Sequence, residues 1–209
     1  MKKFFLLLLA LTLTMGASAQ LSVLEVMQKS AKAVDLKKGL KGTATVKMVG
    51  FGDDVYFEYA DNMMRTKDGE DITYINDSTI YEYEKKKNTV TISTEKDACA
   101  MLLMPIAMVQ AFAVDSLPDN PLDTKKLKME KTKEGYEITM DADGNKMIFI
   151  IDANNYKVKS MKIKKSIITI LSYSYKNLAP FSDAASLKYD SSKFPGAKIV
   201  DERGKAKKK

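Results

Sequence analysis

The chain of 209 residues contains no histidine, no tryptophan and a single cysteine. Without histidine, it lacks imidazole-based catalytic triads, imidazole metal ligands and a histidine general base. With Cys99 as its one thiol, an internal disulfide bond is impossible. An enzyme of this composition would depend on carboxylates, lysines and hydroxyls, and no carboxylate pair has a spacing that indicates acid–base catalysis. We therefore predict that the protein is not an enzyme and has no cofactor and no metal site.

Residues 141–145, DADGN, superficially resemble a calcium-binding loop. Such a loop would need glycine at its sixth position, where Lys146 stands instead. The spacing predicts a hairpin turn with Gly144 at positive φ. The many tyrosines are likewise interpreted as strand residues rather than as a sugar-binding platform, because aromatic side chains are favoured in strands.

The first residues have the pattern of a secretory signal peptide. Lys2 and Lys3 precede an apolar stretch at residues 4–15, which is too short to span a bilayer, and small residues follow at 17–19. No cysteine follows the cleavage site, so lipid attachment at a new N-terminal cysteine is excluded. We expect cleavage of residues 1–19 and export of a soluble protein that is not lipid-anchored.

The formal net charge of +7 is concentrated at the two ends of the chain. Without residues 1–19 and 201–209, 27 of the 34 basic and 25 of the 27 acidic residues remain, so the centre is close to neutral. No basic patch interleaved with aromatics argues for nucleic acid. We expect one domain over residues 20–200 and a solvated basic tail over 201–209. This tail has the charge to touch anionic lipid headgroups, at about 1 kcal/mol per residue.

The most apolar stretch after the signal is residues 98–112, ACAMLLMPIAMVQAF, which includes three methionines. Its composition indicates a helix, and a fully apolar helix must be covered by another part of the molecule. Methionine adapts well to irregular or changing partners. Two interpretations remain open: a core helix fixed on a sheet, and a lid that covers an apolar cavity while the cavity is empty. Cys99 lies between alanines in this stretch and is predicted to be a buried, inert thiol.

Short alternating strands fill most of the remaining chain, after an amphipathic helix at residues 21–36. The predicted strands are residues 43–51, 55–59, 63–66, 71–75, 79–83, 88–93, 127–132, 136–141, 146–152, 157–164 and 166–175. The gaps inside each group of strands are too short for crossover helices, which favours antiparallel pairing. The apolar phase shifts between Val158 and Met161, which predicts a bulge. The fold class is mostly β (α+β): one large curved antiparallel sheet of eleven strands with one dry face, plus an edge segment at residues 199–200.

The inward face of this sheet is predicted from strand phase, because apolar residues alternate with charged neighbours that take the opposite phase. The predicted inward residues are Val46, Met48, Val55, Phe57, Tyr59, Ile72, Tyr74, Ile138, Met140 and Phe149.

Three stretches and the order of the elements resemble the outer-membrane lipoprotein carrier family, LolA. Residues 61–65 (DNMMR) with 78–83 (STIYEY) are similar to the family's strand pair, in which an apolar strand and a Leu-Trp-x-Tyr-like strand each follow a turn. Residues 105–109 (PIAMV) resemble its lid helix, and 194–203 (FPGAKIVDER) resemble its C-terminal ending. The family's strand-end arginine, implicated in lid closure, falls near Ala60 here, so that role is not assigned to Arg65.

The resemblance implies an unclosed β-barrel covered by an N-terminal helix and a central apolar lid helix. Its hollow would hold the acyl chains of lipoproteins that cross the periplasm to the outer membrane. It also implies an inner-membrane release machinery and an outer-membrane acceptor as partners. We therefore expect a monomeric periplasmic carrier that binds no nucleic acid. The helix residues added to the predicted lipid site are Met101, Met104, Ile106, Met108 and Phe112.

Two other functions remain open from the sequence. One is a lipid sensor or envelope-stress regulator with the same fold. The other is a structural β-protein whose core is filled by its own side chains.

Overall fold

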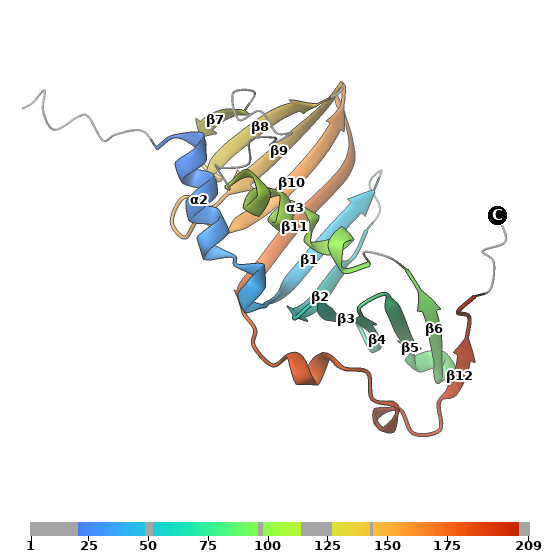
Figure 1. Cartoon of the computed structure of the whole chain (residues 1–209). Helices are drawn as coiled ribbons and strands as arrows, with labels where there is room; N and C mark the ends of the chain where they lie inside the picture. Colours follow the sequence, from blue (N-terminus) through green and yellow to red (C-terminus); the bar gives the residue numbers. More distant parts are fainter. Residues whose placement is uncertain (1–20, 49–51, 96–97, 114–126, 143, 205–209) are drawn as a thin grey trace, which may run out of the picture.

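The computed structural model describes residues 21–48, 52–95, 98–113, 127–142 and 144–204. The predicted signal peptide and residues 205–209 of the basic tail lie outside this part of the chain. The described residues form one sheet of 12 strands, in the order β12-β6-β5-β4-β3-β2-β1-β11-β10-β9-β8-β7. Figure 1 shows that the sheet is strongly curved and that helices α2 (Val23–Ala33) and α3 (Ala98–Phe112) lie on its concave side.

The strands are β1 (Leu40–Met48), β2 (Asp54–Ala60), β3 (Met63–Asp68), β4 (Asp71–Asn76), β5 (Thr79–Glu84), β6 (Thr89–Thr94), β7 (Leu127–Lys131), β8 (Tyr136–Ala142), β9 (Asn145–Ile151), β10 (Val158–Lys165), β11 (Ile168–Pro180) and β12 (Lys198–Asp201). Short 3₁₀ helices are η1 (Leu36–Lys38), η2 (Lys85–Lys87), η4 (Ala184–Leu187) and η5 (Ser191–Lys193).

Strand β1 connects the two groups of strands, because it pairs with β2 on one side and with β11 on the other. The strands at the two ends of the order, β12 and β7, do not pair with each other, so the barrel is unclosed. All neighbours are antiparallel except β12, which runs parallel to β6. The predicted antiparallel, unclosed architecture is confirmed, and the edge segment at residues 199–200 is a twelfth strand.

The register defines the concave face of the sheet. Directly opposed residues form a row across six strands: Val46, Tyr173, Met161, Phe149, Ile138 and Met129. This row is apolar except for the tyrosine hydroxyl, and it belongs to the main core with the helices. The register also shifts between Val158 and Ser160, so the predicted bulge is confirmed.

Helix α2 begins with a capping box in which Ser22 and Glu25 satisfy each other's backbone N–H groups. It buries Val26 and Met27 and ends at Ala33, earlier than the sequence pattern predicted. The chain then passes through η1 to Gly39, whose φ is +72°. A side chain at Gly39 would collide with the carbonyl oxygen of Phe181, so this close approach requires glycine.

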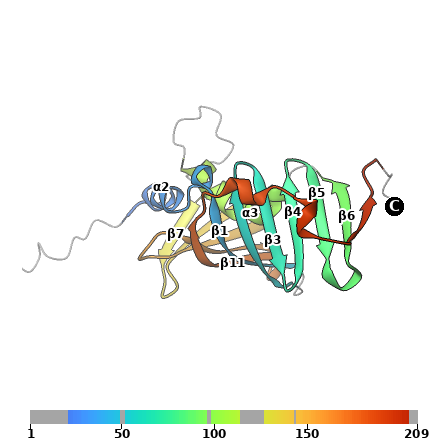
Figure 2. The same ribbon diagram turned by 90° about the horizontal axis from the view of Figure 1, so that it is seen from below.

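The convex face carries a second core beneath the C-terminal segment, residues 181–197, which crosses β2 to β6 (Figure 2). Here Tyr189 stacks on Tyr81, with ring centroids 4.1 Å apart, and Phe194 lies against Tyr74 at 6.2 Å. This overturns one prediction, because Ile72 and Tyr74 pack in this convex core and not on the inward face. Strand β4 is apolar on both faces, and its register places Ile75 on the concave side, opposite Met64.

Candidate functional site

Helix α3 lies in the hollow of the sheet and fills it with its own side chains. Its deepest residues are spaced three apart along one side of the helix: Leu103, Ile106, Val109 and Phe112. Phe112 meets Phe149 of the sheet edge to face, with ring centroids 6.0 Å apart. Residues 98–112 therefore form a helix that covers an apolar face of the sheet, as predicted.

The outer side of α3 is apolar as well, which is unusual for a surface helix. Its exposed residues are Ala100, Met101, Ala107 and Ala111. Met101 is 66% exposed, so it points away from the hollow, while Met104 and Met108 are half-buried at its edges. The helix contains no charged residue, so no ion pair holds it in place.

Within the described residues, three polar contacts join the α3 segment to the rest of the protein. The hydroxyl of Tyr175 on β11 donates to the carbonyl of Leu102, with 2.7 Å between the oxygens. The side-chain amide of Gln110 donates to the carbonyl of Val34, at 2.8 Å, where α2 ends. The third is a weak contact at 3.9 Å between the Cys99 sulfur and a backbone carbonyl of the β2–β3 turn.

Pro105 lies inside α3 and is itself buried. Proline has no N–H to donate to the carbonyl four residues earlier, which is that of Met101. The helix therefore contains one weakened turn near its middle, next to the carbonyl that Tyr175 contacts. Burial raises the pKa of Tyr175 far above its usual value, so this hydroxyl remains a donor at any ordinary pH.

Cys99 lies at the start of α3 and is 7% exposed, which confirms the prediction of a buried thiol. Burial raises the pKa of Cys99 to about 11. The thiolate is the reactive form, so this cysteine is inert while α3 occupies the hollow.

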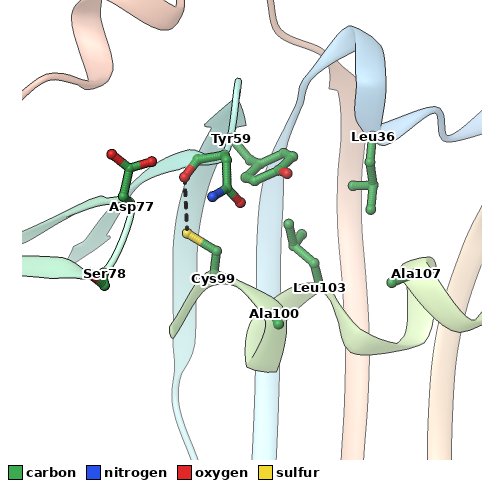
Figure 3. A pocket seen from close by; sticks show the side chains of 9 residues that line it. Leu36, Tyr59, Asp77, Ser78, Cys99, Ala100, Leu103 and Ala107 are labelled. Carbon is green, nitrogen blue, oxygen red and sulfur yellow. Dashed lines mark hydrogen bonds between the residues drawn. The ribbon is translucent and has the colours of Figure 1, made fainter. Parts of the chain in front are cut away.

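An open recess of about 420 Å³ lies between the start of α3 and the ends of the strands (Figure 3). This size falls within the usual range of ligand pockets, about 300–1,000 Å³. Leu36, Leu103 and Tyr59 form its apolar wall, and Asn62 and Asp77 form its polar wall. Figure 3 shows Cys99 pointing across this recess, and the contact drawn from its sulfur is the one to the Asn62 carbonyl. Cys99 and Leu103 belong both to this recess and to the main core, so the recess adjoins the hollow.

The predicted site residues fall into distinct places. Eight of the ten predicted strand residues lie on the concave face by register: Val46, Met48, Val55, Phe57, Tyr59, Ile138, Met140 and Phe149. Ile72 and Tyr74 do not, as described above. Among them Met48 is 64% exposed, because it lies at the end of β1, beyond the reach of α3. Of the helix residues, Ile106 and Phe112 point into the hollow.

Strand phase alone missed several residues that line the same hollow, namely Met64, Ile75, Ile151, Met161, Tyr173 and Tyr175. The signal was present in part, because Tyr173 and Tyr175 share a phase on the last long strand. Their place became clear only from the pairing of β11 with β1, where Tyr173 lies opposite Val46.

Arg65 lies on the convex side, away from α3. Its guanidinium contacts the carboxylate of Glu58, through Nε at 2.8 Å, and reaches the carbonyl of Ser186 at 3.4 Å. It therefore ties the C-terminal segment to the sheet. Gly144 has a φ of +77° at the β8–β9 hairpin, as the turn interpretation predicted.

No helix among the described residues is long and apolar enough to cross a membrane. The described ranges also contain no cluster of three side chains suited to hold a metal ion.

The sequence matches no protein-family model and no curated protein. Its structure is similar to that of an uncharacterized conserved protein from Thermus thermophilus, with a TM-score of 0.49 and 14% identity over 85% of this chain and 97% of that chain. It is also similar to MucB in the MucA/MucB complex of Pseudomonas aeruginosa (TM-score 0.38, 10% identity), over 80% of this chain but 61% of that one. A LolA superfamily protein from Nitrosomonas europaea has a TM-score of 0.34 and 4% identity over 83% of this chain and all of its own length (100%). At these identities the likeness is one of fold alone.

Proposed function

We propose that this protein is a carrier that binds the acyl chains of lipoproteins on its concave face, beneath α3, and shuttles them across the periplasm toward the outer membrane. The proposal rests on one observation: α3 fills the hollow with apolar side chains but makes few polar contacts with the rest of the protein. One uncharged helix, apolar except for Gln110, occupies it, held within the described residues by two hydrogen bonds and one weak sulfur contact. Such a helix can be replaced by another apolar occupant.

The energies of the two occupants are comparable. Four buried side chains of α3 contribute about 1.5–3 kcal/mol each, and therefore about 6–12 kcal/mol together. An acyl chain contributes about 0.8 kcal/mol per buried methylene, so a dozen methylenes supply about 10 kcal/mol. Because neither occupant dominates, cargo could enter and also leave. A carrier needs this balance, since a ligand shifts an equilibrium only by its differential affinity for the two states.

The recess beside α3 supports an entry route for the chains. It opens at the N-terminal end of the helix, where Cys99 makes the weakest of the three contacts. Its apolar wall leads from the surface to Leu103, the first deeply buried residue of the helix. Lifting this end would widen the recess into the hollow.

A second candidate is a structural β-protein with a permanently filled core. The observation in its favour is that Ile106, Val109 and Phe112 are each 1% exposed, as in an ordinary core. The two candidates differ in whether α3 can leave while the sheet remains folded.

Cys99 allows this difference to be measured without any substitution, because it is the single thiol of the chain. The exported protein is incubated with a synthetic triacylated lipopeptide or with the same peptide lacking acyl chains. Binding is followed by native mass spectrometry, and the rate of maleimide labelling of Cys99 is measured in parallel. We expect a complex with the acylated peptide alone, and labelling that is faster by about tenfold, equivalent to about 1.4 kcal/mol.

Absence of a complex with the acylated peptide would overturn the carrier function and favour the filled core. A complex that leaves the Cys99 rate unchanged would overturn the displacement of α3. The circular dichroism of the sheet, recorded on the same samples, distinguishes a lifted helix from general unfolding.

A further inference from the structure

The tip of the β10–β11 hairpin, residues 164–168, is the most exposed apolar feature of the described structure. Ile167 is 92% exposed and Ile168 is 62% exposed. The turn is tight, because Lys165 and Ile168 are paired and two residues connect them. Glycine, asparagine and aspartate are the residues that suit such turns, and isoleucine offers neither their backbone freedom nor their solubility. These isoleucines therefore serve neither the turn nor the core.

The neighbouring strand ends lie beside this tip. In Figure 1 the ends of β8, β9, β10 and β11 converge at one end of the sheet, far from the C-terminal strand β12. The β8–β9 turn reaches the same level, since Asn145 is paired with Lys165. On the other side, Met48 ends β1 opposite Leu171, three residues below Ile168, and is also largely exposed. Three of the five large exposed apolar side chains of the described residues thus gather at this end.

Lysines surround these apolar residues. The lysines of the tip and its neighbouring strands are Lys146, Lys162, Lys164 and Lys165. Lys164 lies directly opposite Lys146 in the sheet, an arrangement of like charges that disfavours pairing. None of the four forms an ion pair with a described residue, although Asp141 is the cross-strand neighbour of Lys146. The nearest acid on β2, Asp54, is already engaged by Lys176 at 3.0 Å.

We propose that this tip docks the protein on an anionic bilayer surface. The two isoleucines enter the headgroup region, where apolar side chains are removed from water, and the surrounding lysines lie against lipid phosphates. The occupant is argued from charge complementarity, because unpaired cations around an exposed apolar tip match anionic headgroups above acyl chains. A protein partner would instead favour a larger and less charged patch.

This inference goes beyond the carrier function and holds whether or not acyl chains enter the hollow. It concerns the place where the molecule meets a membrane, which lies at the rim of the same concave face. Met147 and Leu171 of the main core lie next to this tip, at the end of the concave face opposite to the recess beside α3.

The first test measures the binding of the exported protein to large vesicles by sedimentation. Vesicles of phosphatidylglycerol and phosphatidylcholine are compared with vesicles of phosphatidylcholine alone, at low and at high salt. We expect binding to the anionic vesicles that weakens strongly at high salt, because the screening length falls to about 3 Å at 1 M. The double variants Ile167→Ser with Ile168→Ser, and Lys164→Gln with Lys165→Gln, should each bind about tenfold more weakly.

Matched controls come from the opposite end of the sheet. Ile199→Ser removes an isoleucine that is 51% exposed on β12, and Lys86→Gln removes an exposed lysine of η2. Both should bind like the unchanged protein. The basic C-terminal tail is present in every variant, so a difference between variants belongs to the tip.

A second readout uses the absence of tryptophan from the chain. Ile167→Trp places a single indole at the tip, and Ile199→Trp places one on β12. We expect the fluorescence of the tip variant to shift to the blue on anionic vesicles and to be quenched by brominated lipid, with neither change in the control. Failure of the unchanged protein to bind anionic vesicles, equal binding by the tip variants, or an unshifted tip indole would each overturn the proposal. Self-association that the tip variants abolish, without vesicle binding, would assign the tip to a second copy of the chain instead.

Discussion

Replacing Tyr175 by phenylalanine removes the one side-chain hydrogen bond that joins α3 to the floor of the hollow within the described residues. The hydroxyl donates to the carbonyl of Leu102 at 2.7 Å, and the ring packs against Phe57 with centroids 6.5 Å apart. Phenylalanine keeps this ring contact. The substitution therefore changes a polar contact of the helix and leaves the apolar surface of the hollow almost unaltered.

The expected magnitude follows from the partial burial of this hydrogen bond. A hydrogen bond of this kind contributes about 0.5–1.5 kcal/mol net, and a buried carbonyl left with one partner fewer adds to the loss, for a total of about 1–3 kcal/mol. Because the bond connects α3 to the sheet, its loss destabilises the state in which α3 occupies the hollow, relative to the lifted state in which α3 has left it. An increase of about tenfold in the population of the lifted state corresponds to about 1.4 kcal/mol.

The assay is the rate at which a bulky maleimide labels Cys99 in the folded protein. We expect Tyr175→Phe to increase this rate by about tenfold. The matched control is Tyr173→Phe, two residues away on the same strand. That ring is equally buried, but its hydroxyl makes no hydrogen bond with a described residue. The control should label at the rate of the unchanged protein.

One result would refute this reasoning. If Tyr175→Phe lowers the denaturation midpoint of the whole protein while the Cys99 rate rises only in proportion to global unfolding, then α3 does not open separately. The helix would then be part of a fixed core.

Three further predictions concern the same helices. Ile106→Asp places an unpaired charge in a dry site at a cost of several kcal/mol, so we expect α3 to leave the hollow, the β-sheet circular dichroism to persist and an apolar dye to bind more strongly. Ser30→Ala removes a buried hydroxyl that has no hydrogen-bond partner among the described residues, so the free energy of unfolding, measured by urea denaturation, should increase by about 1 kcal/mol. The pKa of about 11 for Cys99 predicts that labelling of the folded protein keeps rising with pH through pH 10, whereas the unfolded chain levels off near its ordinary pKa of about 8.5. Since the folded state holds the proton more tightly, stability should fall as pH rises from about 8.5 toward 11.

Local sequence patterns predicted the bounds of a helix or strand well where a single pattern, such as a continuous apolar stretch, extends over the whole element. The helix at 98–112 has the same bounds in sequence and structure, because an uninterrupted apolar stretch without β-branched runs favours helix throughout. The first strand begins at Leu40 rather than at residue 43, since pairing with Tyr59 and Pro180 extends it. Such extension depends on partners that lie far away along the chain.

The candidate site was predictable only in part, for the same reason. Alternation placed Phe57 and Ile138 correctly, because the opposite phase of their strands carries polar residues. Phe149 also lies on the concave face, although its neighbours Ile148 and Ile150 in the opposite phase are apolar. It failed for Ile72 and Tyr74, because β4 is apolar on both faces and the aromatic residues that cover its convex side follow more than a hundred positions later. The bond between Tyr175 and Leu102 joins residues 73 positions apart, and no local pattern indicates it.

Binding of acyl chains on the concave face can be mapped with a lipopeptide whose acyl chain carries a photoactivatable group. After irradiation of the complex, the modified residues are mapped by mass spectrometry. We expect labels on the concave face, at Phe57, Phe149 and Met161, and on the buried side of α3. The convex residues Ile72 and Tyr74 should remain unlabelled. Labelling of both faces to the same extent, or of the convex core alone, would show that the acyl chain does not bind on the concave face.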